Sequence, residues 1–305
     1  MQSRFLGILA LASLATPAAA LDFGNGFSVV GDVELSYLSS GGSSTSTFGF
    51  EDVTLGWRSQ AGGAIGYGFD LNFVGVQDLD QGDPLSTIWG GLVLTTAAGE
   101  FTIGNPRPLL KTLFDTPYIG GDRIFDLEFG SLIGSSVEYF ALLSDEGLYG
   151  VSFKGGTGAL TYGASYHKFD TEDASAYELV AGYQAGKTQI QGGVEVLDVT
   201  AFTIRKFLLG ATYVSDRWSA GAQLSHSTQP MGDLTGFEVF GDYAVSDSFK
   251  LGAQVLRLEG LGSPVTFYGV TGEYGFGSGG FARLGVLDTS QGSDTSYSAS
   301  VGYRF

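Results

Sequence analysis

The chain has 305 residues, with 32 Asp and Glu against 15 Lys and Arg, which gives a formal net charge of −17. This balance argues against nucleic acid as a partner, because phosphate binding needs clustered Lys and Arg. Cysteine is absent, so disulfides and thiolate metal sites are excluded. The 49 Gly, 23 Phe and 15 Tyr, against 7 Pro, favour strands and turns over helices.

The amino terminus has the pattern of a cleaved secretory signal peptide. A basic residue, Arg4, precedes an apolar run from Phe5 to Ala15, and three alanines follow at positions 18 to 20. The apolar run is too short to cross a bilayer as a helix, which argues against a membrane anchor. We therefore expect residues 1–20 to be removed and residues 21–305 to form the mature protein.

The mature chain alternates apolar and polar residues over runs of about ten residues, which Gly, Ser and Asp clusters separate. Side chains alternate between the two faces of a strand, and a tilted strand of about 9 to 11 residues crosses a bilayer. An apolar face suits lipid and a polar face suits water, so the pattern is typical of a transmembrane barrel. It predicts about sixteen strands, near Phe27–Leu38, Phe48–Arg58, Ala64–Val76, Ser86–Thr96, Phe101–Asn105, Leu148–Lys154, Ala159–His167, Ser175–Tyr183, Thr188–Leu197, Phe202–Val214, Trp218–His226, Thr235–Ala244, Phe249–Leu258, Val265–Tyr274, Phe281–Leu287 and Thr295–Phe305.

The last of these runs ends in an aromatic residue. Tyr297, Ala299, Val301, Tyr303 and Phe305 alternate with Ser296, Ser298, Ser300, Gly302 and Arg304. The segment resembles the closing strand of bacterial outer-membrane barrels, in which the terminal aromatic residue acts as an assembly signal. This resemblance makes Phe305 a candidate assembly signal.

The connections between the runs fall into two sets. Short turns such as 155–158 and 184–187 alternate with longer, more acidic loops such as 77–85 and 227–234. With the amino terminus in the periplasm, the short turns are periplasmic and the long loops extracellular. A soluble β-sandwich also explains a period of two, but it does not explain strands of membrane-crossing length together with a signal peptide and a terminal Phe. We therefore predict an all-β fold, a single transmembrane antiparallel β-barrel.

Residues 106–147, between the fifth and sixth predicted strands, form by far the longest connection. A loop this long is uncommon unless it is functional or disordered, and its apolar content argues against disorder. Leu109, Leu110 and Leu113 recur at helical spacing after Pro108, which predicts a short amphipathic helix. We expect the segment to fold against the rest of the protein.

The stretch Phe101–Phe114, with the sequence FTIGNPRPLLKTLF, resembles the fifth strand and third loop of sixteen-stranded bacterial porins, especially those of alphaproteobacteria. In that family the third loop folds into the barrel and narrows the pore, with acidic loop residues facing basic residues on the wall. The resemblance extends over the mature chain in strand count and loop order. It implies that residues 106–147 form a pore-constricting loop.

The resemblance and the alternation of the strands together point to candidate pore residues. In the loop, the resemblance implies Asp115, Asp122, Asp126 and Glu128 as acidic constriction residues, with Arg107, Lys111 and Arg123 in the same loop. On the lumen wall, the alternation puts the acidic residues Asp32, Glu34, Asp70, Glu178, Glu195, Glu238, Asp242 and Glu273 and the basic residues Lys154, Lys206, Lys250 and Arg283. The early strands offer only Arg58, so the basic wall cluster that the resemblance implies is incomplete.

A pore lined by charged side chains selects solutes by its radius and its field, without chemistry. We therefore expect passive diffusion of small hydrophilic solutes and ions across the bacterial outer membrane, with a preference for cations because the inferred lumen is rich in acids. No enzymatic activity, cofactor or metal site is expected. The expected partners are membrane lipid, lipopolysaccharide and the barrel assembly machinery, and the resemblance implies a homotrimer.

Three other functions stay open. An outer-membrane enzyme needs a serine and a histidine, and the chain has only His167 and His226, with no third group that orients either. A structural or adhesive barrel plugged by residues 106–147 has the same apolar composition in this segment. A sugar-selective channel needs aromatic residues stacked along the lumen, for which the alternation offers only Trp89 and Phe240.

Overall fold

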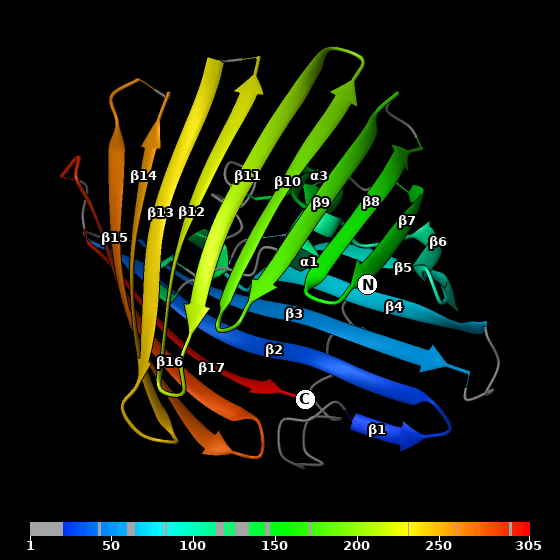
Figure 1. The fold of residues 1–305 in the computed structure, drawn as a ribbon. Helices are drawn as coiled ribbons and strands as arrows, with labels where there is room; N and C mark the ends of the chain where they lie inside the picture. The colour runs from blue at the N-terminus through cyan, green and yellow to red at the C-terminus, as the bar shows by residue number, and fades with distance from the viewer. Residues whose placement is uncertain are drawn as a thin grey trace.

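The structure is a computed structural model, and it describes residues 21–41, 44–59, 65–80, 82, 84–113, 119–121, 123–125, 134–143, 147–170, 173–230, 232–260, 262–292 and 295–305. Its strands form one antiparallel sheet that rolls up into a closed barrel (Figure 1). The expected signal peptide, residues 1–20, lies outside the described residues.

Seventeen strands make up the sheet. They are β1 (Leu21–Gly24), β2 (Phe27–Ser40), β3 (Ser44–Arg58), β4 (Gly66–Asp78), β5 (Leu85–Thr96), β6 (Gly99–Asn105), β7 (Leu148–Thr157), β8 (Leu160–Phe169), β9 (Ser175–Ala185), β10 (Thr188–Val199), β11 (Phe202–Val214), β12 (Trp218–Gln229), β13 (Gly232–Ala244), β14 (Phe249–Glu259), β15 (Val265–Gly277), β16 (Gly280–Thr289) and β17 (Ser296–Arg304). From β2 onward, each strand pairs with the next one in the chain.

The barrel closes between β2 and β17, which pair along the whole of β17. Just beyond this pairing, the backbone groups of Phe305 and Gly31 exchange two hydrogen bonds of 2.9 Å. Strands β2 to β17 therefore form a closed barrel of sixteen strands, which confirms the predicted fold. The short strand β1, which pairs with the start of β2, was not predicted, because its four residues are too few to show an alternation.

The two faces of each strand differ as the alternation predicts. On β9, Tyr177, Leu179 and Tyr183 lie on the outer face and are exposed, whereas Glu178 and Val180 point into the barrel and are buried. The outer faces of the other strands carry exposed Leu, Val, Phe and Tyr in the same way. Such a belt of apolar side chains is suited to the hydrocarbon core of a bilayer.

Several strands extend farther than predicted at the end of the barrel where the long connections lie. We call this the loop end, and the opposite end, with short turns such as 158–159, the turn end. The prediction ended β12 at His226 and began β13 at Thr235, whereas the two strands stay paired as far as Gln229 and Gly232. Polar residues occupy both faces there, so the backbone pairing continues after the alternation has faded.

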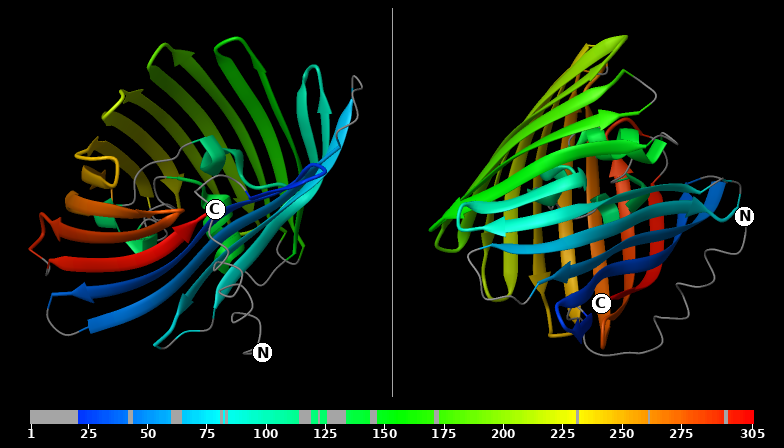
Figure 2. Two further views of the ribbon diagram at one scale, coloured as in Figure 1. Left: turned by 90° about the horizontal axis from the view of Figure 1, so that it is seen from below. Right: turned by 90° about the vertical axis from the view of Figure 1, so that its right-hand side faces the viewer.

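The long connection leaves the barrel wall at Asn105 and returns at Leu148. It contains helix α1 (Leu109–Leu113), the 3₁₀ turn η2 (Ile119–Gly121) and helix α3 (Ser136–Leu143). Figure 2 shows these helices inside the ring of strands, as the resemblance implies for this loop. None of the helices in the described part of the chain is long and apolar enough to cross a membrane.

Apolar side chains attach the loop to the inner wall at three places. Helix α3 packs through Val137, Ala141 and Leu142 in a cluster that includes Trp89 and Leu197. Helix α1 packs through its first two leucines against one residue each of β9 and β11, and Phe125 packs against a cluster on β13 to β16. The alternation predicts a mostly polar inner face with Trp89 and Phe240 as inward aromatic residues, so the other apolar wall residues are unexpected. They face inward because the loop, and not water, covers them.

The outer belt leads to a first prediction. Replacing the exposed outer residue Leu179 by Arg is expected to lower the free energy of unfolding by about 2–4 kcal/mol, because it moves a cation into the hydrocarbon layer. Urea titration of the barrel in lipid vesicles measures this change. The control is Thr212→Arg on the lumen face of β11, which is expected to change the free energy by less than about 0.5 kcal/mol. Equal losses in both variants would contradict the assignment of the two faces.

Candidate functional site

The start of helix α1 is held by a carboxylate on the wall. Glu178 of β9 accepts the backbone N–H groups of Leu109, at 2.6 Å, and Leu110, at 3.3 Å. The first N–H groups of a helix have no partner within the helix, and an anion there is favoured by the helix dipole. Ser165 also donates to Glu178, and His167 Nε2 lies 3.5 Å from it. This buried network fixes the loop soon after it leaves β6.

Helix α3 is attached in the same way to β10. Ser135 precedes the helix, and Glu138 is three residues farther on, which is the sequence pattern of a capping box. Glu195 of β10 accepts the Ser135 hydroxyl and the Ser136 N–H, both at 2.9 Å. Lys206 lies opposite Glu195 in the strand register. Its ammonium group donates a hydrogen bond of 2.6 Å to the backbone carbonyl of Gly134 in the loop.

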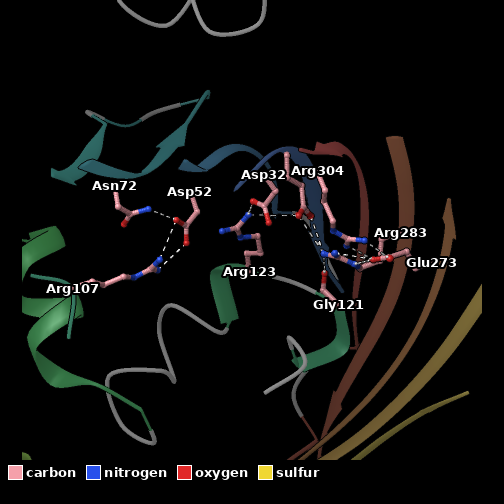
Figure 3. Close-up of polar contacts among 10 residues, drawn as sticks. Asp32, Asp52, Asn72, Arg107, Gly121, Arg123, Glu273, Arg283 and Arg304 are labelled. Carbon is pink, nitrogen blue, oxygen red and sulfur yellow. Dashed lines mark hydrogen bonds and ion pairs between the residues drawn. The ribbon is translucent and has the colours of Figure 1, made fainter. Parts of the chain in front are cut away.

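Arg107 joins the loop to the wall of β3. Its guanidinium donates to both carboxylate oxygens of Asp52, at 3.1 and 2.8 Å, and to Glu138 of helix α3 at 2.7 Å. Asn72 of β4 also donates to Asp52, at 2.7 Å, as Figure 3 shows. Burial alone lowers the pKa of Arg107, but the charges of Glu138 and Asp52 outweigh it and raise the pKa, so this side chain stays protonated.

A second cluster of ion pairs holds the middle of the loop. Arg123 donates to Asp32 of β2 and lies over the ring of Phe50, 5.2 Å from its centroid. On the neighbouring wall, Arg283 of β16 binds Glu34 at 3.1 Å and Glu273 at 3.0 Å. Figure 3 shows that these pairs continue the row that Arg107 and Asp52 begin.

The signs of these charges differ from what the resemblance implies. In porins the loop is expected to be acidic and the facing wall basic, whereas here the loop residues Arg107 and Arg123 meet the wall carboxylates Asp52 and Asp32. Lys111 pairs within the loop itself, with Glu138 at 3.5 Å. The four acidic loop candidates, Asp115, Asp122, Asp126 and Glu128, lie outside the described residues.

The candidate residues of the lumen wall fall into two groups. Those beside the loop are buried, which the sequence did not predict for side chains in a water-filled lumen: Glu34, Glu178, Glu195, Glu238, Lys206 and Arg283. Those nearer the turn end are more open to solvent: Asp70, Asp242, Lys154 and Lys250. Asp32 and Glu273 are partly covered by their arginine partners. Several wall charges therefore attach the loop instead of lining open water.

Two cavities meet at Arg107. The one on the loop side has a volume of about 60 Å³ and is lined by Asp52, Val76 and Leu142, among others. The one on the turn side has a volume of about 200 Å³, and its lining includes Lys154. Arg107 lines both cavities, whereas its partner Asp52 lines only the smaller one.

The sequence did not single out Asp52 and Glu138, the two acids that bind Arg107. On β3 the alternation is disturbed, because Phe48 and Phe50 face inward and Glu51 faces outward, which hid the inward Asp52. For Glu138, the capping-box spacing after Ser135 was a usable signal of the helix start. Its contact with a residue 31 positions away was not readable from the sequence.

The two histidines lie in different surroundings. His226 lies on the outer face, with Nδ1 3.0 Å from the Thr235 hydroxyl, whereas its sequence neighbours Ser225 and Ser227 point into the barrel. His167 contacts Ser165 at 3.2 Å and Glu178 at 3.5 Å, and all three side chains are buried in the network that binds the start of helix α1. Within the residues that the structure describes, no group of three or more His, Asp or Glu side chains is placed to hold a metal ion.

Comparisons with known proteins place this geometry among solved barrels. No protein-family model matches the chain, and no curated protein matches its sequence. A variant of the Rhodobacter blastica porin has a similar structure, with a TM-score of 0.67, 14% identity, and coverage of 92% of this chain and 100% of that one. A second porin has a TM-score of 0.65 and 18% identity, with coverage of 91% of this chain and 99% of that one. A loop-deletion variant of OmpT, an outer membrane protein of Vibrio cholerae, has a TM-score of 0.67 and 16% identity. The match covers 91% of this chain and 98% of that one.

The chain has the porin fold. The resemblance that the stretch Phe101–Phe114 suggested is thus confirmed at the level of the fold, with a sixteen-stranded barrel and a long loop inside it. At identities of 12 to 18%, the comparison carries over the architecture of the porin fold and not the roles of individual residues.

The anchoring of the porin loop leads to a second prediction. Glu178→Gln keeps the shape of the side chain but removes the charge that accepts the α1 N–H groups, so the free energy of unfolding is expected to fall by about 1–3 kcal/mol. Urea titration measures this change in the free energy of unfolding. The control is Asp242→Asn, a lumen carboxylate that binds Ser219 on the wall. A loss as large in the control would contradict a specific role for Glu178.

Proposed function

We propose that the chain is an outer-membrane porin that lets small hydrophilic solutes and ions diffuse through its lumen. The observation that carries this proposal is a closed barrel with an apolar outer belt, a charged inner wall and a long loop attached inside the lumen. The porin fold supports it, since the similar structures are of porins and of an outer membrane protein. Catalysis is not part of the proposal.

A cation preference belongs to the same proposal. The net charge of −17 and the numerous lumen carboxylates favour cations over anions in the field of the pore. At the loop, however, the arginines neutralise many of these carboxylates. We therefore expect a modest preference.

Planar-bilayer recording tests both parts of this proposal. We expect stepwise currents from the purified barrel, and in a salt gradient a reversal potential of cationic sign. The absence of any current would refute the channel, whereas a reversal potential of anionic sign would refute only the cation preference.

A plugged barrel is the second candidate, because the described parts of the loop contact several walls. Helix α1 packs on β9, and η2 packs on β14 to β16. Deleting residues 115–130 distinguishes the two functions by single-channel conductance. A constricted pore is expected to conduct before the deletion and to conduct more after it, whereas a plug conducts only after it. Shortening the connection between β14 and β15 is the control, and it is expected to leave the conductance unchanged.

We further propose that the protein forms a homotrimer, with subunit contacts on the outer face around Glu51. This glutamate lies on the outer face of β3, beside Gly75 of β4, halfway along a strand whose outer neighbours are apolar. A carboxylate facing lipid is costly, whereas one covered by a partner subunit can be hydrogen-bonded. Membrane lipid, lipopolysaccharide and the barrel assembly machinery, acting through Phe305, complete the proposed partners.

The variant Glu51→Leu tests the subunit contact, because the two environments give opposite results. If Glu51 lies in an interface, the variant is expected to lower the temperature at which the oligomer dissociates, as measured by native electrophoresis after heating. If Glu51 faces lipid, the variant stabilises the barrel and leaves its oligomeric state unchanged, which would contradict the proposal. Val53→Leu, at the next outer position of β3, is the control.

A further inference from the structure

The cavity on the turn side of Arg107 is formed by neighbouring strands and one edge of the loop. Its volume is about 200 Å³, which corresponds to roughly seven water molecules at liquid density. Residues of β3 to β7 line it, together with Pro106, Arg107 and Thr112 of the loop. A small organic solute fits in such a space.

Most of the charges around this cavity are already paired. Asp70 accepts two hydrogen bonds of 2.7 Å from Arg58, and Glu100 lies 3.4 Å from the same guanidinium. Arg107, which also lines this cavity, is paired with Asp52 and Glu138 of the neighbouring smaller cavity. These carboxylates therefore repel an approaching anion less than free carboxylates do.

Lys154 differs from these paired charges, because it has no partner among the described residues. It lies directly opposite Glu100 in the register of β6 and β7, at a position where side chains are close enough to pair. Glu100 turns instead toward Arg58, and Lys154 makes no hydrogen bond or ion pair within the described residues. Its side chain is exposed to the lumen. The cavity therefore contains an ammonium group that is available to a ligand.

Two hydroxyl groups stand next to this lysine. Thr102 and Ser152 lie opposite each other in the same register, two residues along each strand from Glu100 and Lys154 and therefore on the same face of the sheet. Both line the cavity. Neither makes a side-chain hydrogen bond within the part of the chain that the structure describes. Ser152 is buried in the wall. One cation and two hydroxyl donors on adjacent positions form a set of donors that suits an oxyanion.

We infer that this cavity is a binding site for a small solute that carries a carboxylate or phosphate group, with the oxyanion held by Lys154, Thr102 and Ser152. The inference rests on the proposed porin function and adds a solute class to it. A solute bound here lies beside Arg107, which also lines the smaller cavity on the loop side. A local oxyanion site is compatible with a modest cation preference of the whole pore, because small cations pass along the acidic wall without using it.

Calorimetric titration of the purified barrel with inorganic phosphate, and separately with lactate, tests the site without requiring conductance. Lys154→Gln is expected to weaken the binding of at least one of the two probes about tenfold or more, since the charge-assisted hydrogen bond is lost. Ser152→Ala is expected to weaken it less. The matched control is Lys250→Gln on β14, a lumen lysine outside this cavity, which is expected to bind like the wild type.

Three results would overturn the inference: no binding of either probe by the wild-type barrel, equal affinity in the wild type and Lys154→Gln, or an equal loss in Lys250→Gln. Single-channel recording of the same preparation keeps the two proposals separate. Binding without conductance refutes the channel and leaves the site, whereas conductance without binding refutes the site and leaves the channel. The phosphate and lactate titrations also decide which oxyanion the site prefers.

Discussion

The structure depends on one constraint, the pairing of every backbone N–H and C=O group where no water is present to replace a partner. In a bilayer an open sheet would leave two edges unpaired, so the sheet closes between β2 and β17, and the terminal Phe305 bonds to Gly31 at the seam. Closure gives every strand a lipid side and a lumen side, and the alternation of side chains follows from it. The described parts of the long loop lie in the space that the strands enclose.

The polar residues of the inner wall bind the loop as well as water. Polar residues are required on the inner wall because water reaches it, yet Glu178 and Glu195 are buried and bind the first N–H groups of the two loop helices. Arg107 and Arg123 of the loop neutralise Asp52 and Asp32 of the wall, and the wall residue Arg283 neutralises Glu34 and Glu273 beside it. Apolar clusters on the wall complete the contact. Nearer the turn end, Lys154 and Lys250 of the wall are exposed.

The sequence predicts the barrel well because its signal is local. On β9 the period of two is unbroken, and both the strand and its two faces are as predicted. On β3 the inward Phe50 and the outward Glu51 disturb the period, and Asp52 was therefore missed. The loop is a different case. The pairing of Arg123 with Asp32 joins residues 91 positions apart, and no spacing in the sequence encodes it. The helix start at Ser135 was readable, but the wall residue that binds it was not.

The attachment of the loop also restricts the order in which the protein folds. The loop follows β6 in the chain, but Leu109 at the start of its helix α1 is bound by Glu178, 69 positions later. The carbonyl of Gly120 accepts a hydrogen bond from Ser298, 178 positions later. Contacts of such long sequence separation form slowly, because the chain between them must be ordered first. The described parts of the loop therefore take their places only when the carboxyl-terminal strands are present. During synthesis and transport, its apolar side chains have no wall to cover them, and they need protection from aggregation until the barrel closes.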